Sequence, residues 1–138
     1  ELPELNGLEV NGSGNITAQT DLKTDQLNLE INGSGNILFM DIEAVSLKGE
    51  INGSGKIEGV SGKVSNASLE INGSGNINGE NLNCQTLSAL IAGSGSIIVG
   101  MVKDMDADIA GSGNISYNGK AETINKDIAG SGKVISRQ

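Results

Sequence analysis

Carboxylates recur three residues before a repeated Gly-Ser-Gly triplet, and their types and spacing could support metal or ligand binding. The triplet occurs seven times, and in six copies the residue three positions earlier is Asp or Glu. These residues are Glu9, Glu30, Glu50, Glu70, Asp108 and Asp127, and Leu90 takes the place in the remaining copy. If the copies stack, the carboxylates form one column and repel each other unless water, a partner or a bridging cation compensates. Calcium is the cation that such hard oxygen ligands favour.

Two features of the sequence argue against a dedicated calcium site in this acidic column. Calcium-binding β-rolls repeat Gly-Gly-x-Gly-x-Asp at a nine-residue step, whereas this triplet lacks both the second leading Gly and the Asp. A carboxylate that recurs in six of the seven copies also singles out no unique position. We therefore expect a solvated acidic face without a metal or a cofactor, and we treat the column as the candidate binding surface.

Residues for catalysis are scarce. The chain has no His, and its one Arg is Arg137, so nucleophile-base pairs and arginine clamps are missing. The single Cys84 is expected to be a buried structural thiol because no His can activate it. Asp104 and Asp106 interrupt the repeat most visibly, although surface charge is the expected reading of both. We predict that the chain is not an enzyme, and a glycan-degrading activity ranks as a distant third hypothesis.

Charge and composition restrict the possible partners. Nine Lys and Arg residues stand against 17 Asp and Glu residues, which gives a net charge of −8 at pH 7. This charge repels phosphate backbones and anionic lipids, so we expect neither a nucleic acid partner nor membrane insertion. Only 1% of the residues are aromatic, so the core must consist of aliphatic side chains.

The spacing of the triplets predicts the elements that carry the column. Successive triplets begin 18 to 21 residues apart, and a period of about 20 residues is typical of solenoid proteins. Two residues before and four residues after the first Gly, every copy has Ile or Val. β-branched residues on both sides of a Gly-rich turn indicate two strands joined at that turn. In the other half of the repeat, apolar residues recur without a fixed register, which predicts a second strand and a turn of variable length. These residues are Leu22, Ile42, Val60, Val64, Leu82 and Val102.

Two all-β architectures fit this repeat. Each unit could be one coil of a parallel β-helix or one hairpin of an antiparallel meander, since Asn-Gly is a strong hairpin signal. A hairpin needs only its turn residues to repeat, whereas here the flanking Ile positions, the central Ser and the preceding acid repeat too. We therefore predict one β-helix domain over residues 1–138, with about seven coils. Asn11, Asn32, Asn52 and Asn72 would then form a ladder.

The repeated unit, as in residues 69–77 (Leu-Glu-Ile-Asn-Gly-Ser-Gly-Asn-Ile), resembles the GIN domain, the head domain of auto-transporter adhesins. Residues 111–119 are similar to that family's closing Gly-Ser-Gly-x-Ile-x-Tyr-x-Gly segment, with Tyr117 at the aromatic position. The residue after the triplet, usually Asp in the family, is Asn, Lys or Ser here. The longer N-terminal part usual in the family is also missing, so residues 1–138 would be the C-terminal part of a longer domain. The resemblance implies an exported bacterial protein with a right-handed β-helix and an adhesion role, and it carries over no binding residues.

Two hypotheses follow for the function. In the first, a non-enzymatic β-helix at the cell surface or in the periplasm displays a face that binds a host or matrix glycan or protein. In the second, bare coil ends stack into a homo-oligomer or structural polymer, as in bactofilins or curli subunits.

Overall fold

The chain winds into an all-β solenoid, as the triplet spacing predicted. The computed structural model describes residues 7–18, 22–119 and 121–137. The strands are β1 (Gly7–Gly12), β2 (Asn15–Ala18), β3 (Leu22–Gly33), β4 (Asn36–Gly53), β5 (Lys56–Gly73), β6 (Asn76–Gly79), β7 (Leu82–Gly93), β8 (Ser96–Gly111), β9 (Asn114–Asn118), β10 (Thr123–Ala129) and β11 (Lys133–Arg137). Among the residues described, no helix is long and apolar enough to cross a membrane.

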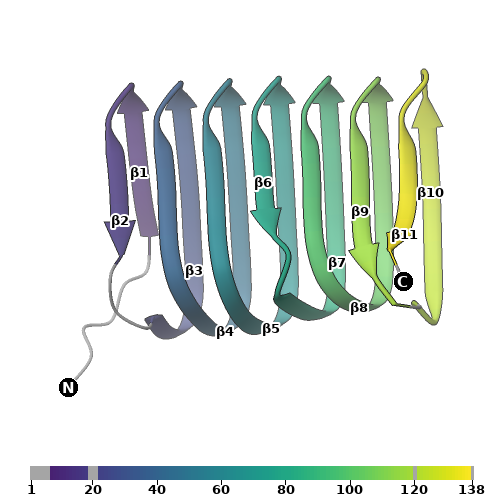
Figure 1. The fold of residues 1–138 in the computed structure, drawn as a ribbon, viewed down its shortest axis with the longest axis horizontal. Helices are drawn as coiled ribbons and strands as arrows, with labels where there is room; N and C mark the ends of the chain where they lie inside the picture. Colours follow the sequence, from purple (N-terminus) through teal and green to yellow (C-terminus); the bar gives the residue numbers. More distant parts are fainter. Residues whose placement is uncertain (1–6, 19–21, 120, 138) are drawn as a thin grey trace.

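Every strand pairing in the described chain is parallel, which rules out the antiparallel meander. Equivalent residues of successive repeats lie side by side, for example Ile51 beside Ile71 and Gly53 beside Gly73. Seven triplets delimit six intervals, so the solenoid has about six turns rather than the predicted seven coils. In Figure 1 the chain ascends on the far side, crosses over at the Gly-Ser-Gly turn and descends on the near side while it advances from left to right. This winding is right-handed, as expected.

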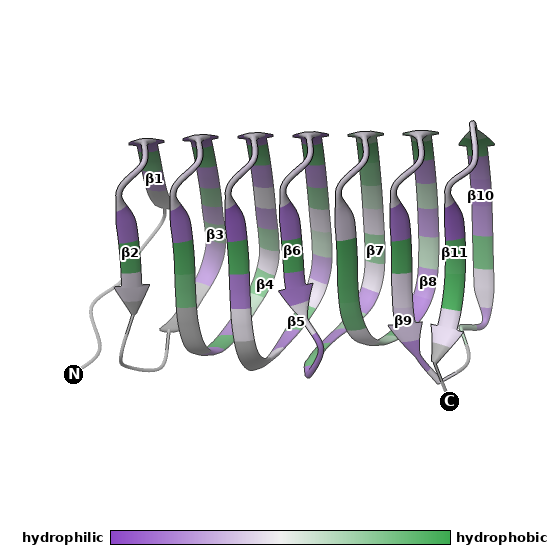
Figure 2. Ribbon diagram, turned by 45° about the horizontal axis from the view of Figure 1, so that its top comes forward, coloured by the Kyte–Doolittle hydropathy of each residue, from purple (hydrophilic) through white to green (hydrophobic). Residues whose placement is uncertain are grey.

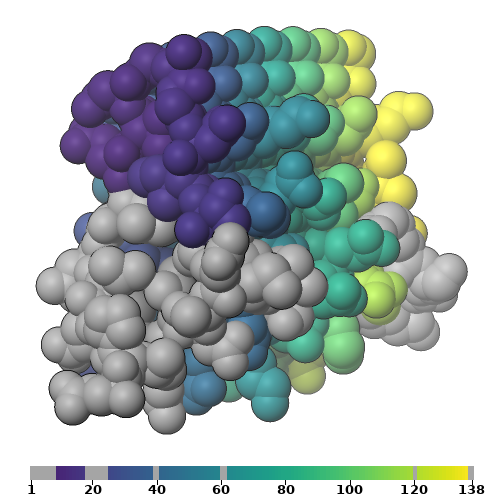
Figure 3. Space-filling view, turned by 60° about the vertical axis from the view of Figure 1, so that its left-hand side comes forward, coloured from purple at the N-terminus to yellow at the C-terminus, as the bar shows by residue number. Residues whose placement is uncertain are grey.

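The Gly-Ser-Gly turns require glycine for two separate reasons. The first Gly of each triplet has a positive φ, between 101° and 135°, which side chains with a Cβ rarely adopt. The second Gly packs directly beneath the preceding coil, where a Cβ on Gly75 would lie 2.5 Å from the carbonyl oxygen of Gly55. The Ser between them donates its backbone N–H to the coil before, as Ser54 does to the carbonyl oxygen of Gly33 at 3.0 Å. Figure 3 shows the resulting turns as straight rows of atoms along the solenoid.

Stacked aliphatic columns fill the interior. The column two residues before the triplet runs from Val10 through Ile31, Ile51, Ile71, Ile91 and Ile109, of which the Ile residues are 0% exposed, to the half-buried Ile128 in the last coil. The column four residues after the first Gly continues the core on the descending strands, where Figure 2 shows it as an apolar band below the turns. Both columns confirm the predicted inward positions.

The looser half of the repeat differs from the prediction. Its apolar residues do keep register, because Leu22, Ile42, Gly62 and Leu82 form one column and Ala44, Val64, Cys84 and Val102 form another. No separate second strand or turn of variable length is present in β4 or β5, each of which runs 18 residues from one triplet to the next. Side chains of a strand normally alternate between the inside and the outside of the solenoid. At this point two consecutive side chains, such as those of Val45 and Ser46, both face outward, and the strand bends there without breaking. Among the described residues, the strand is interrupted by a turn at Glu80 and Asn81 between β6 and β7, and again between Asn118 at the end of β9 and Thr123 at the start of β10, so the predicted second strand and turn exist in these repeats.

Candidate binding surfaces

A polar face with a shallow hollow covers the outside of the ascending strands. Three rows of outward side chains cross β3, β4, β5, β7 and β8 in register, and all of them are exposed or half-buried. The rows, called here the polar face, are Gln26, Ser46, Asn66, Thr86 and Asp104; Asn28, Lys48, Ser68, Ser88 and Asp106; and Glu30, Glu50, Glu70, Leu90 and Asp108. Asp104 and Asp106, which stood out in the sequence, therefore extend two of these rows.

The predicted acidic column exists as a continuous line. Parallel pairing places Glu9 beside Glu30, then Glu50, Glu70, Leu90, Asp108 and finally Asp127. Its three central Glu side chains are half-buried, whereas Glu9, Asp108 and Asp127 are exposed. Among the described residues, no group of three or more His, Cys, Asp or Glu side chains is arranged to hold a metal ion.

An asparagine ladder holds the central carboxylates of this column. Asn52 donates its side-chain amide to Oδ1 of Asn32 at 2.9 Å and to Oε2 of Glu50 at 3.1 Å. Asn72 repeats the pattern with Asn52 at 3.0 Å and Glu70 at 2.9 Å. Asn32 does the same with Asn11 and Glu30. The ladder confirms the predicted Asn stack, and it supplies the partners that relieve repulsion between neighbouring carboxylates.

Breaking the ladder should lower stability. Replacing Asn52 with Ala removes two donated hydrogen bonds and one accepted bond, so we expect a loss of about 1–2 kcal/mol in the free energy of unfolding. Ala fits this column, because Ala92 occupies it in a later coil. The matched control is Asn76→Ala on the far side of a turn, where the side chain is exposed, with an expected change below about 0.5 kcal/mol. Guanidinium denaturation compares the two, and equal losses would contradict the role of the ladder.

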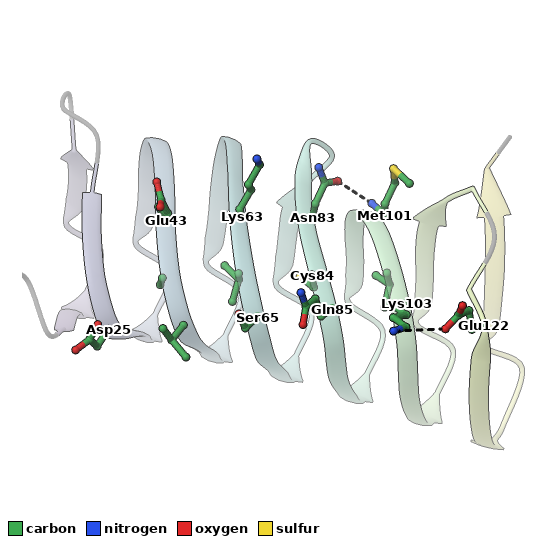
Figure 4. Close-up of a pocket in the computed structure, with 14 residues that line it drawn as sticks. Asp25, Glu43, Lys63, Ser65, Asn83, Cys84, Gln85, Met101, Lys103 and Glu122 are labelled. Atoms are coloured by element: carbon green, nitrogen blue, oxygen red, sulfur yellow. Dashed lines mark hydrogen bonds and ion pairs between the residues drawn. The ribbon is translucent and has the colours of Figure 1, made fainter.

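A second surface, the axial groove, follows the bend of the strands and was not anticipated from the sequence. One wall is the row Glu43, Lys63, Asn83 and Met101, and the other is the row Val45, Ser65, Gln85 and Lys103. Asp25 and Glu122 lie at its two ends. Figure 4 shows the labelled wall residues in two lines that run across successive strands. These lines arise at the bend, where two consecutive residues of each strand face outward. A search of the sequence for two consecutive polar residues between apolar ones would have located the bend.

The floor of the axial groove is apolar. It consists of Ala44, Val64, Cys84 and Val102, which are between 3% and 8% exposed. Along the walls, Asn83 Oδ1 accepts a hydrogen bond from the backbone N–H of Met101 at 3.0 Å, and Lys103 pairs with Glu122 at 3.8 Å. That ion pair is exposed, so it adds little to stability.

Cys84 is a free, buried thiol, as expected from the sequence. Burial raises its pKa from 9.0 to about 12, because an apolar environment disfavours the charged thiolate. The folded state therefore gains stability from the neutral thiol at every pH below about 9, and this contribution is lost as the pH rises from 9 towards 12.

This pKa predicts slow alkylation of the native protein. At pH 8 the thiolate fraction of Cys84 is about a thousandfold lower in the folded chain than in the unfolded chain. Iodoacetamide should therefore modify the native protein at least about 100-fold more slowly than the protein in guanidinium. Mass spectrometry follows the reaction, and comparable rates in the two conditions would contradict the burial of the thiol.

The sequence matches the family described as "Putative auto-transporter adhesin, head GIN domain" over residues 1–121. The chain belongs to this family. The fold, the triplet turns and the closing segment of this GIN domain agree with the resemblance noted from its repeats. No curated protein is significantly similar to it in sequence.

Crystal structures of similar proteins include ones from Bacteroides and Parabacteroides species. A "Putative lipid binding protein" from Parabacteroides distasonis is 36% identical, with 96% of this chain and 53% of that chain covered and a TM-score of 0.90. A "putative adhesin" from Bacteroides fragilis is 28% identical, with coverage of 96% and 61% and a TM-score of 0.90. Another from Parabacteroides merdae is 26% identical, with coverage of 94% and 54% and the same TM-score. The chain thus spans between 53% and 61% of the length of these relatives.

Proposed function

We propose that this GIN domain is a non-enzymatic binding domain of an exported bacterial protein, and that it adheres to a glycan or protein ligand at the cell surface. The family description and the adhesin names of two structural relatives support adhesion. Export and the surface location rest on the same family membership.

The polar face is the observation that carries this proposal. Its rows repeat hydrogen-bonding groups at the strand spacing of about 4.8 Å on a rigid sheet. At the centre of the face, Asn66, Ser68 and Glu70 project outward from β5, with equivalent residues on the strands beside them. Such an ordered array costs little conformational entropy on binding, and it suits an extended ligand with many polar groups.

Binding to a glycan array and to immobilised extracellular matrix proteins tests the proposal. For any ligand found, Ser68→Arg in the middle of the polar face should weaken binding at least about tenfold through steric conflict. Asn76→Arg introduces the same side chain at an exposed site after the turn, and it should change binding less than about twofold. If both variants bind equally well, or if no member of either panel binds, the polar face is not an adhesion surface.

One structural relative is named as a lipid binding protein, so amphiphiles belong in the same ligand screen. Assembly through coil ends stays a prediction that sedimentation velocity tests directly. Species that grow without limit as the protein concentration rises would support an open polymer. A fixed monomer or small oligomer would contradict it.

A further inference from the structure

Exposed apolar side chains concentrate at the axial groove. The described residues contain three large apolar side chains that are exposed, namely Val45 at 52%, Met101 at 60% and Ile135 at 41%. Two of them, Val45 and Met101, form part of the groove walls. Together with the apolar floor, these two side chains give the groove more exposed apolar surface than the neighbouring polar face has.

The groove lining carries three carboxylates, Asp25, Glu43 and Glu122, and two lysines, Lys63 and Lys103, so an anionic group of an aliphatic ligand has to pair with a lysine. None of the described residues that line it is aromatic, so these residues offer no stacking platform for planar rings. Lys63 projects from the middle of one wall, and the described part of the chain places no carboxylate within 4.0 Å of its ammonium group. The other wall lysine, Lys103, already has Glu122 as a partner. Lys63 is therefore the cation available to an anionic head group.

The dimensions of the groove fit one extended hydrocarbon chain. It is an open groove of about 960 Å³, which lies within the usual range for small-molecule sites. From the strand of Lys63 to the coil of Glu122 there are three strand steps, or about 14 Å at 4.8 Å per step. One leaflet of a bilayer has a hydrocarbon depth of about 15 Å, which is the reach of a single acyl chain.

From these observations we propose that the axial groove binds the hydrocarbon chain of one long-chain anionic amphiphile, in the simplest case a free fatty acid. The carboxylate pairs with Lys63, and the chain runs over Val64, Cys84 and Val102 towards Met101. This site borders the polar face, since Val45 of its wall precedes Ser46 of that face, but its walls and floor include none of the polar-face residues, so adhesion at Ser68 and amphiphile binding can fail independently.

Isothermal titration calorimetry of the full chain with decanoate, dodecanoate and tetradecanoate tests the site. We expect saturable one-to-one binding that tightens about threefold to fourfold for each added methylene until the groove is filled. Met101→Asp should weaken dodecanoate binding at least about tenfold. The matched control is Ile135→Asp, which places the same charge on the exposed apolar side chain outside the groove, and its binding should equal that of the unmodified chain.

The head group is tested with Lys63→Met, which keeps the length of the side chain but removes its charge. This variant should weaken dodecanoate binding about fivefold to tenfold and leave binding of dodecanol unchanged. Methyl NMR gives a readout that does not depend on variants, because the exposed Met101 methyl should shift on addition of dodecanoate while that of Met105, which is 2% exposed, should not. Absence of saturable binding, unchanged binding by Met101→Asp, or binding to phosphatidylcholine vesicles without binding to monomeric dodecanoate would each overturn the proposal.

Discussion

Replacing Gly75 with alanine is expected to destabilise the solenoid by about 3 kcal/mol or more. The added Cβ would lie 2.5 Å from the carbonyl oxygen of Gly55 and 2.6 Å from Cγ2 of Ile51. One of these groups is backbone and the other is a fully buried side chain, so neither moves easily. The coils on either side must separate to admit the methyl group, and the hydrogen bonds between their turns weaken as they do.

The chain contains its own control for this substitution. Gly14 occupies the same position in the first triplet, but a Cβ built there meets no atom within 4 Å. Gly14→Ala should therefore change the free energy of unfolding by less than about 1 kcal/mol. Guanidinium denaturation followed by circular dichroism measures both variants. If Gly75→Ala is as stable as Gly14→Ala, close stacking of the coils is not the reason for the second glycine.

The second large effect is expected for Ile71→Ala, at about 3–4 kcal/mol. Ile71 is 0% exposed and lies between Ile51 and Ile91 in the central column. Truncation removes buried methyl groups and leaves a cavity that parallel strands on both sides prevent from collapsing. Because each coil of a solenoid contacts only its neighbours, the cavity weakens two coil interfaces at once.

Three variants test whether the loss of stability comes from a buried cavity or from any truncation of an apolar side chain. Ile71→Val removes one methyl group and should cost about 1 kcal/mol. Ile135→Ala, at a side chain that is 41% exposed, should cost less than about 1 kcal/mol. Denaturation midpoints give the order of the three variants. A loss for Ile71→Ala no greater than that for Ile135→Ala would contradict the assignment of this column to the core.

The two surfaces of the molecule depend on different parts of the same coil. The asparagine ladder lies beside the turns, where it fixes the acidic edge of the polar face. The axial groove lies at the bend, where two consecutive side chains of each strand face outward. The two surfaces adjoin, because Ser65 of the groove wall and Asn66 of the polar face are consecutive outward residues. Ser68 lies beyond the buried Ala67, so Ser68→Arg and Met101→Asp still test the two binding proposals separately.

The sequence by itself determined the coil, its turn and the rows that flank the turn. Each triplet after the first needs glycine twice, once for a positive φ and once for the close approach of the preceding coil, so the turn is visible as a fixed motif. Invariant Ile or Val positions on both sides then set the register. Once the register is set, the acidic column and the Asn ladder follow, because identical residues must stack in a parallel solenoid.

Only the tertiary structure decided what happens at the bend. Gly62 occupies an apolar column there, and one repeat is shortened to 18 residues, so the columns of this half are hidden in the sequence. Pairs of polar residues such as Gln85 and Thr86 mark the point where two neighbours both face outward in several coils, but Val45 takes one of these positions in another coil, and its exposure depends on how each strand packs on the one before. The exposure of Val45 and Met101, and the groove they border, arise from this packing and not from a local preference of the chain.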